Sequence, residues 1–549
     1  MAPKAEEVSR MPEYDKIDVF RGDELKTVVF DEKRDCFPEL MRFLLEDRPE
    51  YAGKICALYG LRRTGKTVLM YQCIRELPLE ARQEAAYILC HRGSEVLELR
   101  RAMKDLMEDG FRYFFIDEVT YLRDFQTYGN VLSDYFEAKG AKIVIAGTDS
   151  LGIRLAEADI LFDRVFQIHT SVIPYGEFSR LLGGKTVQEY IEFGGTLVHG
   201  PYKPEVFWED YQNSAIIENI LHSLEGSEES RRYGAALTEL YSREELVSVI
   251  NKMINKFSYF VTVKAVEKSY RSAPLYAGVH NMPDVPYDEY LDLAKINQAT
   301  KRALGIKDKE EMETDLSPRH LEEIKAYLKD LELFLEVPSY ESLKQGIRNE
   351  NLEIFLQPGM VYAHAEKLIQ QLEKDETWSR ECGISKRRQF LLRTENFVKG
   401  ILLENIVIAE TYLAFRKIAP ERYYVSQLAT RLPSGEYAEA DMIVADQEND
   451  EAYLFEIKYS SNSTEEQTRH LRNPNLIRYA SENFGQVKGR AVLYNGPDEK
   501  EEEEIPYLNA GNFLEDVYSM QRRGEWSFGR WFPEDAERQR DGEEIGKCR

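Results

Sequence analysis

Short apolar runs recur between residues 51 and 170, separated by stretches whose apolar positions follow the 3.6-residue spacing of a helix. The runs, which we predict to be buried strands, span residues 54–59, 85–90, 111–116, 142–147 and 164–169. Buried strands that alternate with helices are typical of a parallel α/β sheet. This region is therefore predicted to be a domain of the α/β class.

The pattern changes on either side of this domain. Residues 1–50 carry one amphipathic helix, near 37–46, and Pro174 marks a boundary after the α/β domain. Residues 205–415 are mostly helical in pattern, whereas residues 420–500 return to strands and turns. The chain is therefore predicted to contain more than one domain.

Residues 60–67 read G-L-R-R-T-G-K-T, which is the spacing of a P-loop. They lie between an apolar run and a helical stretch, the context in which the loop's backbone N–H groups can point at phosphate oxygens. In such a loop Lys66 would reach the β- and γ-phosphates of ATP, and Thr67 would coordinate Mg²⁺. We expect the nucleotide to contact Gly60, Arg63, Thr64, Gly65, Lys66, Thr67, Val68 and Thr148.

The run R-Y-F-F-I-D-E at residues 112–118 fits the Walker B motif of P-loop ATPases. An apolar strand there would carry Asp117 to its C-terminal end, beside Thr67, where the carboxylate can hold Mg²⁺ through water. Glu118 would then polarise the attacking water. An ordinary strand followed by an acidic helix cap is the alternative interpretation.

Two further polar residues follow in the chain. Thr148 is our candidate for sensing the γ-phosphate, although capping of a helix by Asp149 or Ser150 would explain the same sequence. Arg164 could act as a finger on the nucleotide of a neighbouring subunit, which would make the protein a homo-oligomer. A surface salt bridge is the alternative role for Arg164.

A second group of charged residues lies near the C-terminus. Two predicted strands, joined by a turn, would place Asp441 beside Glu456, with Lys458 on the same face as Glu456. This D…E-x-K arrangement is that of restriction-type nucleases, in which two carboxylates bind Mg²⁺ and the lysine orients or activates the water. A helix upstream carries Glu404, which could supply a further carboxylate. A β-hairpin with charged outer faces is the alternative.

Composition limits the classes of protein that fit. The chain has 549 residues, enough for about three or four domains of ordinary size. Its net charge of −25 argues against coating nucleic acid through bulk charge, but leaves room for a local basic groove. The sequence shows neither an apolar run long enough for a transmembrane helix nor a signal-peptide pattern, and its six cysteines lack metal-binding spacing. A cytoplasmic protein that does not bind membranes is therefore expected.

The order of these motifs resembles that in a prokaryotic group of AAA-type ATPases. Members join an N-terminal P-loop domain to a helical, winged-helix-like linker and a C-terminal domain with a PD-(D/E)xK core. The stretches that carry the resemblance are 58–69, 114–119, 145–148, 172–178 (V-I-P-Y-G-E-F), 439–441 and 456–458. The resemblance implies a sheet with an additional strand, nucleotide hydrolysis and a DNA- or defence-related role. Asp163 stands where the family commonly has glycine, which weakens the finger assignment of Arg164.

We therefore predict a multidomain fold with an α/β P-loop NTPase domain of the AAA type, a mostly α-helical winged-helix-like middle and an α/β restriction-endonuclease-like C-terminal domain. The predicted segments, from an N-terminal segment to an acidic C-terminal one, are 1–50, 51–200, 201–390, 391–500 and 501–549. The predicted function is ATP hydrolysis coupled to a metal-dependent nuclease-like domain that acts on nucleic acid, with DNA favoured. The alternative is an ATP-dependent switch or signalling ATPase whose C-terminal domain binds nucleic acid or protein without cutting.

Overall fold

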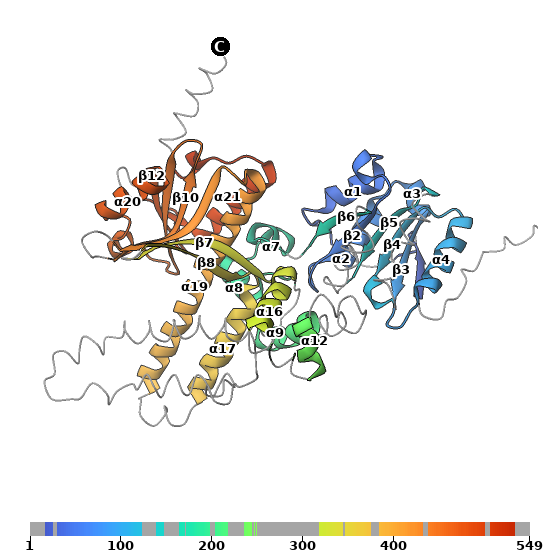
Figure 1. Cartoon of the computed structure of the whole chain (residues 1–549), viewed down its shortest axis with the longest axis horizontal. Helices are drawn as coiled ribbons and strands as arrows, with labels where there is room; N and C mark the ends of the chain where they lie inside the picture. The colour runs from blue at the N-terminus through green and yellow to red at the C-terminus, as the bar shows by residue number, and fades with distance from the viewer. Residues whose placement is uncertain are drawn as a thin grey trace, which may run out of the picture.

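The structure is a computed structural model of the whole chain (Figure 1). The residues that it describes are 17–122 (apart from 23 and 26–29), 139–147, 164–197 (apart from 171), 204–217, 235–249 (apart from 244–245 and 247–248), 318–374 (apart from 344–345), 384–431, 437–499 and 505–532. Two sheets organise this part of the chain, one in an N-terminal domain and one in a C-terminal domain.

The N-terminal domain is built on a sheet of six described strands. In spatial order they are β1 (Ile17–Arg21), β3 (Ala85–Cys90), β4 (Tyr113–Asp117), β5 (Lys142–Ala146), β2 (Ile55–Tyr59) and β6 (Val165–His169). All neighbouring strands run parallel except β1 and β3. The strands predicted from the apolar runs are confirmed, each to within two residues of its observed ends.

The strand order brings the P-loop and the Walker B residues to one edge of this sheet. β5 lies between β2, which leads into the P-loop, and β4, which ends at Asp117. This is the additional-strand arrangement that the family resemblance implied, and it is confirmed. Because parallel strands end at the same edge, the residues that follow β2 and β4 face one another there.

Helices cover both faces of the N-terminal sheet (Figure 1). They are α1 (Phe37–Leu45), α2 (Lys66–Glu76), α3 (Leu79–Gln83) and α4 (Val96–Glu108). α4 buries Leu99 and Met103, four positions apart and so on one side of the helix, in one apolar core. α1 and α2 bury Leu40 and Leu69 in a second core on the opposite face. The helix expected near residues 37–46 is thus confirmed as α1.

β1 makes the N-terminal segment part of this domain. It pairs antiparallel with β3, from Ile17 opposite Cys90 to Arg21 opposite Ala86. The structure therefore differs from the predicted boundary at residue 50. Only Ile17 of this strand is fully buried, so β1 gives no continuous apolar run from which it could have been predicted.

The C-terminal domain is built on a mixed sheet of seven described strands. In spatial order they are β13 (Tyr507–Asn509), β12 (Gln486–Tyr494), β11 (Glu451–Lys458), β10 (Tyr437–Asp446), β9 (Tyr423–Arg431), β7 (Phe334–Leu343) and β8 (Gly346–Phe355). β9, β10 and β11 are antiparallel neighbours, whereas β12 runs parallel to β11. Its helices are α19 (Ile384–Ile418), α20 (Pro474–Phe484) and α21 (Ala510–Arg523).

These helices cover opposite faces of the C-terminal sheet. Phe455 of β11 packs in a cluster with Leu403 of α19 and Phe513 of α21. The preceding residue, Leu454, packs in another cluster with Leu476 of α20. Since successive residues of a strand point to opposite faces, α19 and α21 lie on one side of the sheet and α20 on the other.

The middle of the chain is helical with a β-hairpin. Its described helices are α7 (Tyr175–Leu181), α8 (Val187–Phe193), α9 (Pro204–Gln212), α12 (Ala235–Ser242), α16 (Pro318–Asp330) and α17 (Pro358–Lys374). The sequence predicted mostly helix here, but residues 334–355 form the β7–β8 hairpin, which extends the C-terminal sheet beside β9. Residues 250–317 of the predicted winged-helix-like region, 201–390, lie outside the described residues.

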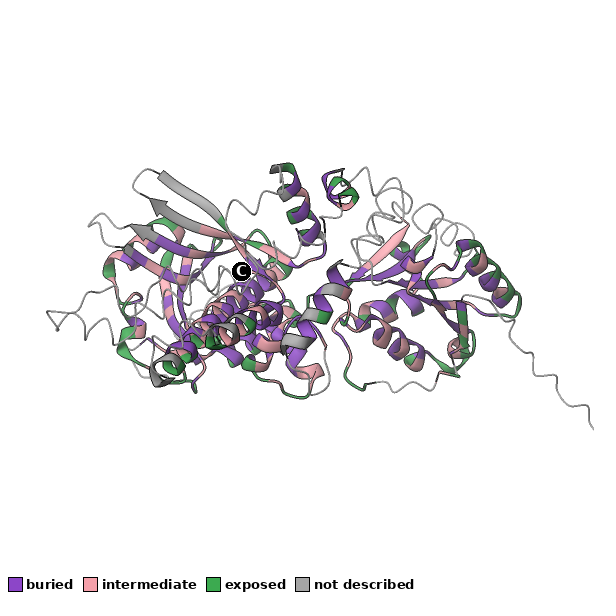
Figure 2. Ribbon diagram, turned by 90° about the horizontal axis from the view of Figure 1, so that it is seen from below, coloured by how far each residue is buried: buried purple, intermediate pink, exposed green. Residues whose placement is uncertain are grey.

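Part of the predicted acidic C-terminal segment, 501–549, belongs to the C-terminal domain, because residues 507–523 supply β13 and α21 to it. Buried residues gather in both sheets and on the inward sides of their helices (Figure 2).

Within the described ranges, no helix combines the length and the apolarity needed to cross a bilayer. Three of the described free cysteines, Cys56, Cys73 and Cys90, are buried, where they act as small apolar side chains.

Candidate functional site

The loop at residues 60–65 connects the end of β2 to the start of α2. Gly65 has a φ of +89°, in the left-handed region where a side chain is strained, and it directly precedes Lys66, the first helical residue. The first N–H groups of α2 have no partner within the helix and border the loop. An anion at this position would be bound by these N–H groups and by the helix dipole.

Lys66 is a buried cation of this loop. Its Nζ donates hydrogen bonds to the carbonyl oxygens of Gly60 (2.6 Å) and Leu61 (2.8 Å). Burial lowers the pKa of Lys66 to about 8, although the carboxylates of Glu118 and Asp117 partly oppose this shift. A desolvated ammonium gains from a neighbouring phosphate, so Lys66 fits the part of a phosphate ligand.

Asp117 is held by hydrogen bonds at the end of β4. Its Oδ2 accepts from Thr67 Oγ1 (2.7 Å) and from Tyr87 Oη (2.9 Å), while Oδ1 accepts from the backbone N–H of Glu118 (2.9 Å). A threonine hydroxyl in contact with a carboxylate provides the hard oxygen ligands that Mg²⁺ prefers. The residues present therefore fit a Mg²⁺ ion bound by Thr67 and Asp117.

Tyr87 is a site residue that sequence reasoning missed. Burial, and then the charge of Asp117, raise the pKa of Tyr87 well above its ordinary value, so the phenol stays protonated and donates. Tyr87 lies on β3 opposite Phe115 of β4. The feature that could have identified Tyr87 is a tyrosine inside an apolar strand. Had the strand order been known, it would have placed this tyrosine beside Asp117.

A cavity of about 480 Å³ lies at the P-loop. The predicted nucleotide contacts that line it are Arg63, Gly65, Lys66, Thr67 and Val68. Phe30, Glu32 and Arg34 of the N-terminal segment line it as well. Gln72 of α2 fixes this segment, because its Nε2 donates to the carbonyl oxygens of Phe30 (2.7 Å) and Glu32 (2.8 Å). No motif in the sequence predicts these three lining residues.

Of the other residues predicted for the ATPase site, Gly60, Thr64 and Arg164 are not among those that line this cavity. Thr64 is buried, and its Oγ1 lies 2.9 Å from Oγ1 of Thr170. Thr148 lies outside the described residues. Arg164 directly precedes β6, which runs parallel to β2, so Arg164 and the P-loop lie at opposite ends of these strands. A finger role for Arg164 would therefore require the nucleotide of a second copy of the chain.

The C-terminal domain brings Asp441, Glu456 and Lys458 together. A β-bulge in β10 falls at Asp441 and locally bends the strand. Oδ2 of Asp441 accepts from the backbone N–H of Ile457 (2.7 Å) and from Nζ of Lys458 (2.8 Å). The same Nζ lies 3.4 Å from Oε1 of Glu456. The three side chains thus form one charged group on β10 and β11.

The electrostatics of this group are set by burial. Burial, and then the charge of Asp441, raise the pKa of Glu456 well above its ordinary value, which favours the protonated form at neutral pH. Oε2 of Glu456 is buried and has no hydrogen-bond partner among the described residues. Burial alone would lower the pKa of Lys458, but the carboxylate of Asp441 raises it above its ordinary value, so this side chain is an ammonium.

The carboxyl groups of Asp441 and Glu456 fit a Mg²⁺ ion. The buried Oε2 of Glu456, which has no hydrogen-bond partner among the described residues, would be a ligand of the ion. In the part of the chain that the structure describes, no group of three or more His, Cys, Asp or Glu side chains is arranged to hold a metal. The ion would therefore take its remaining ligands from water and from substrate. Glu404, the predicted further carboxylate, accepts a hydrogen bond from Gln427 Nε2 (2.8 Å) and does not complete such a group.

The lowered pKa of Lys66 predicts that affinity for ATP depends on pH. Bound phosphates would raise the pKa of Lys66 above its value of about 8, so binding takes up a proton above that pH. The affinity should therefore fall, by up to about tenfold for each unit above pH 8, as the free protein loses this proton. Titration calorimetry in buffers of different ionisation enthalpy measures the uptake. The affinity of Lys66→Arg for ATP should not fall in this way above pH 8, because arginine stays protonated. An equal fall of affinity with pH in wild type and variant would contradict the role of Lys66.

Comparison with known proteins bears on the N-terminal domain. Residues 52–179 match the family described as an AAA domain. Among solved structures, the chain is similar to the Orc1 protein of Aeropyrum pernix in a complex with DNA, with 14% identity, 60% of this chain and 91% of that chain covered, and a TM-score of 0.19. No curated protein matches the chain. With the P-loop, Asp117 and the additional strand all inside the matched stretch, this chain contains an AAA-type P-loop ATPase domain.

Proposed function

We propose that this chain is an ATP-hydrolysing AAA-type ATPase coupled to a Mg²⁺-dependent nuclease-like domain that acts on nucleic acid, with DNA favoured over RNA. The observation that carries the nuclease part is that Asp441, Glu456 and Lys458 lie together on two neighbouring strands, with Oε2 of Glu456 buried and without a hydrogen-bond partner among the described residues. The ATPase part is supported by the AAA-domain match and by the geometry around Thr67. A cytoplasmic location and a homo-oligomeric state stay predictions from the sequence.

In the ATPase domain, catalysis is mainly positioning and stabilisation of charge. Lys66 and the N-terminus of α2 would hold the phosphates, and Thr67 with Asp117 would hold Mg²⁺, which offsets the charge on the phosphate oxygens. Glu118 would orient the attacking water by accepting its hydrogen bond. The water oxygen bonds to the γ-phosphorus as the bond to the bridging oxygen breaks, the water gives up a proton to solvent, and ADP and phosphate leave. Arg164 would contribute only from a neighbouring copy.

In the C-terminal domain, Asp441 and Glu456 would hold Mg²⁺, which polarises the scissile phosphate when bound. Because Lys458 is an ammonium, it can donate to the attacking water or to a phosphate oxygen, but it cannot accept the proton of the water. The water oxygen bonds to phosphorus and gives up a proton to solvent, the bond to the leaving sugar oxygen breaks, and that oxygen takes a proton from solvent. Binding of ATP would control this step by changing how the two domains contact one another.

A second candidate is an ATP-dependent switch whose C-terminal domain binds nucleic acid or protein without cutting. The observation that favours it is that Lys458 Nζ already contacts Asp441 Oδ2, an oxygen that a metal would need. The described residues also provide no third acidic ligand. In this case the ion pair would be a structural feature of a binding platform, with the same ATPase site.

Glu118→Gln tests the ATPase assignment. The variant should bind ATP and hydrolyse it about a hundredfold or more slowly, because the amide cannot orient the water as the carboxylate does. Lys66→Ala should lose ATP binding. Phosphate release and binding of a non-hydrolysable analogue measure the two effects. Phosphate release that survives both substitutions would show that the P-loop assignment is wrong.

Metal binding at Asp441 and Glu456 is tested by thermal unfolding of the nucleotide-free protein. At ten times its Kd, Mg²⁺ should add about 1.4 kcal/mol to the free energy of unfolding. Binding must displace the proton of Glu456, so the concentration of Mg²⁺ needed should fall as the pH rises from about 6 to about 9.

The same burial makes the metal-free protein lose stability as the pH rises. Below the pKa of the unfolded chain the raised pKa of Glu456 contributes stability, and this contribution is lost as the pH rises through the higher pKa of the folded chain. Glu456→Gln should remove both this pH dependence of the free energy of unfolding and the increase in that free energy on addition of Mg²⁺. Asp117→Asn, which changes only the metal ligand at the P-loop, is the control and should keep them.

Lys458→Ala separates the two candidate functions. Wild type and variant would be incubated with DNA and with RNA, with Mg²⁺ or Mn²⁺, in the presence and absence of ATP. A nuclease should cleave, and the variant should be slower by about a hundredfold, since it lacks the ammonium that positions the water. Absence of cleavage under every condition, or equal cleavage by the variant, would favour the non-cutting switch.

A further inference from the structure

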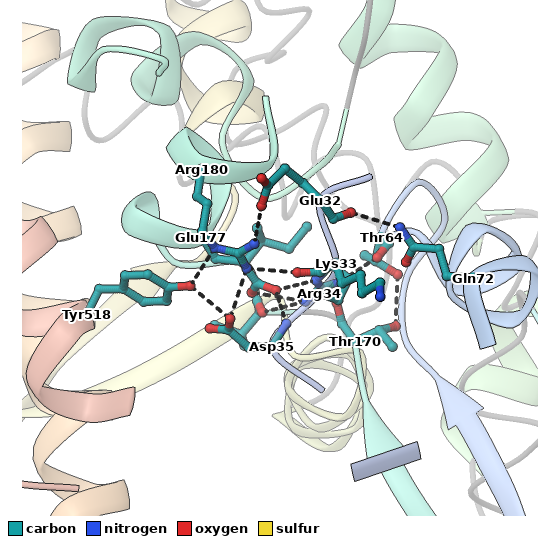
Figure 3. A network of polar contacts seen from close by, with 12 residues as sticks. Glu32, Lys33, Arg34, Asp35, Thr64, Gln72, Thr170, Glu177, Arg180 and Tyr518 are labelled. Atoms are coloured by element: carbon teal, nitrogen blue, oxygen red, sulfur yellow. Dashed lines mark hydrogen bonds and ion pairs between the residues drawn. The ribbon is translucent and has the colours of Figure 1, made fainter. Parts of the chain in front are cut away.

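The V-I-P-Y-G-E-F stretch at residues 172–178 has a place in the structure that neither site explains. It leads into α7, which lies between the two domains (Figure 1). Side chains of α7 contact residues 30–36, which we call the strap, and the strap contacts the P-loop (Figure 3). The path from the P-loop to the C-terminal domain can therefore be followed contact by contact.

Arg34 of the strap is buried against the P-loop, with 6% of its surface exposed. Its Nη1 donates to the carbonyl oxygen of Thr64, within the loop, and to that of Thr170, directly after β6 (3.2 Å). The guanidinium carries several donors in a fixed plane, so it can bridge both carbonyls at once. Arg34 thereby fixes the P-loop backbone one residue before Gly65.

Glu177 of α7 holds Arg34 from the other side. Arg34 Nε donates to Glu177 Oε1 (2.7 Å), and the same oxygen accepts the backbone N–H of Asp35 (2.8 Å). Both charged side chains are buried. Burial by itself would lower the pKa of Arg34, but Glu177 raises it above its ordinary value. Loss of one partner of such a pair leaves a buried charge unpaired, so each side chain depends on the other.

α21 of the C-terminal domain contacts the same segment. Tyr518 Oη donates to Asp35 Oδ1 (2.9 Å). Arg180 of α7 donates from Nη2 to that same oxygen (2.9 Å) and from Nε to Tyr518 Oη (3.3 Å). The Tyr518 ring lies over Gly176, where an added Cβ would come within 2.3 Å of it. The position of α7 is therefore tied to that of α21.

A second contact links α7 to the C-terminal domain. Glu410 of α19 accepts the backbone N–H of Tyr175, the first residue of α7, through Oε1 (2.7 Å). This carboxyl is 8% exposed, and burial raises its pKa to about 8. A side chain of another domain thus satisfies a free N–H group at the start of α7. Docking of the C-terminal domain fixes the helix at this end as well as at Gly176.

The strap lies between two cavities. Glu32 and Arg34 line the nucleotide cavity, and Arg34 and Asp35 line a cavity of about 660 Å³ between the domains. Neighbouring residues of the strap therefore face the nucleotide on one side and the C-terminal domain on the other. A shift of the strap on either side changes contacts on both.

We propose that Arg34 is a positioning residue for ATP binding, because it holds the P-loop backbone in place. Docking of the C-terminal domain on α7 determines how firmly Arg34 is held against the P-loop. The inference rests on the proposed nucleotide site. Undocking would release α7, weaken the hold of Glu177 on Arg34 and leave the Thr64 carbonyl without its partner. Since linkage is reciprocal, ATP at the P-loop stabilises the docked position of α21 by the same amount.

Two substitutions in the full chain test this coupling. Arg34→Lys keeps a charge opposite Glu177, but its single nitrogen cannot occupy the separate positions of Nε, which contacts Glu177, and Nη1, which contacts the two carbonyl oxygens. Tyr518→Phe removes the hydroxyl on Asp35 and leaves Arg34 in place. We expect Arg34→Lys to raise the Kd for a non-hydrolysable ATP analogue and the KM for ATP about tenfold. Tyr518→Phe should raise both about threefold with little change in kcat. A purely structural role of Tyr518 would lower Tm without changing Kd.

Tyr424→Phe is the matched control. Tyr424 lies on β9 and stacks on Phe484 of α20, which packs on the opposite face of the sheet from α21. The variant loses the same hydroxyl from the same domain and should bind the analogue as wild type does. Equal weakening in Tyr424→Phe and Tyr518→Phe, or unchanged binding in Tyr518→Phe, would overturn the coupling.

Hydrogen exchange gives a readout that does not need hydrolysis. The analogue should slow exchange of the amides of Asp35 and Tyr175, which donate to Glu177 and Glu410. Lys66→Ala, which should not bind the analogue, should show no slowing. Unchanged exchange at both amides in wild type would overturn the proposal. Slowed exchange in a protein that releases no phosphate would refute the proposed ATP hydrolysis and still support the role of Arg34.

Discussion

The buried ion pair between Arg34 and Glu177 is the interaction on which the arrangement of the two domains depends. Removing two such charges from water costs several kcal/mol for each ion, as an order of magnitude. The pair is tolerated because its remaining hydrogen-bonding groups are satisfied: the guanidinium also donates to the carbonyls of Thr64 and Thr170, and the carboxylate also accepts the Asp35 N–H. The strap, the P-loop, the end of β6 and the start of α7 therefore meet at one point.

The ATPase half of the molecule could be predicted because its chemistry lies in contiguous stretches. Glycine, lysine and threonine at fixed spacing defined the P-loop, and an apolar run ending in Asp117 defined the opposite side of the site. Tyr87 and Arg34 could not be predicted in the same way. Tyr87 reaches Asp117 across 30 positions of sequence, and Arg34 reaches Glu177 across 143 positions. Only tertiary packing brings such partners together.

The C-terminal half was predictable where local periodicity decides the outcome. Residues two apart on a strand share a face, so Glu456 and Lys458 were expected on one side, and a hairpin placed Asp441 opposite them. The partner of Glu404 is Gln427, a contact between a helix and a strand that no spacing encodes. The β7–β8 hairpin was not predicted. Its β7 strand pairs in parallel with β9, where Ser339 lies opposite Gln427, 88 positions later (427 − 339), and local pattern does not specify such a pairing.

The pairing of β1 with β3 determines where this domain can be cut. A fragment that begins near residue 52, where the AAA-domain match begins, would lose β1 and with it the cover on one edge of the sheet. β3 would then present a row of open backbone N–H and C=O groups, which is a template for association with other chains. Such a fragment would also lack Phe30, Glu32 and Arg34 from the wall of the nucleotide cavity. An aggregated or weakly binding fragment would therefore reflect the missing edge strand and strap, and would say little about the ATPase of the full chain.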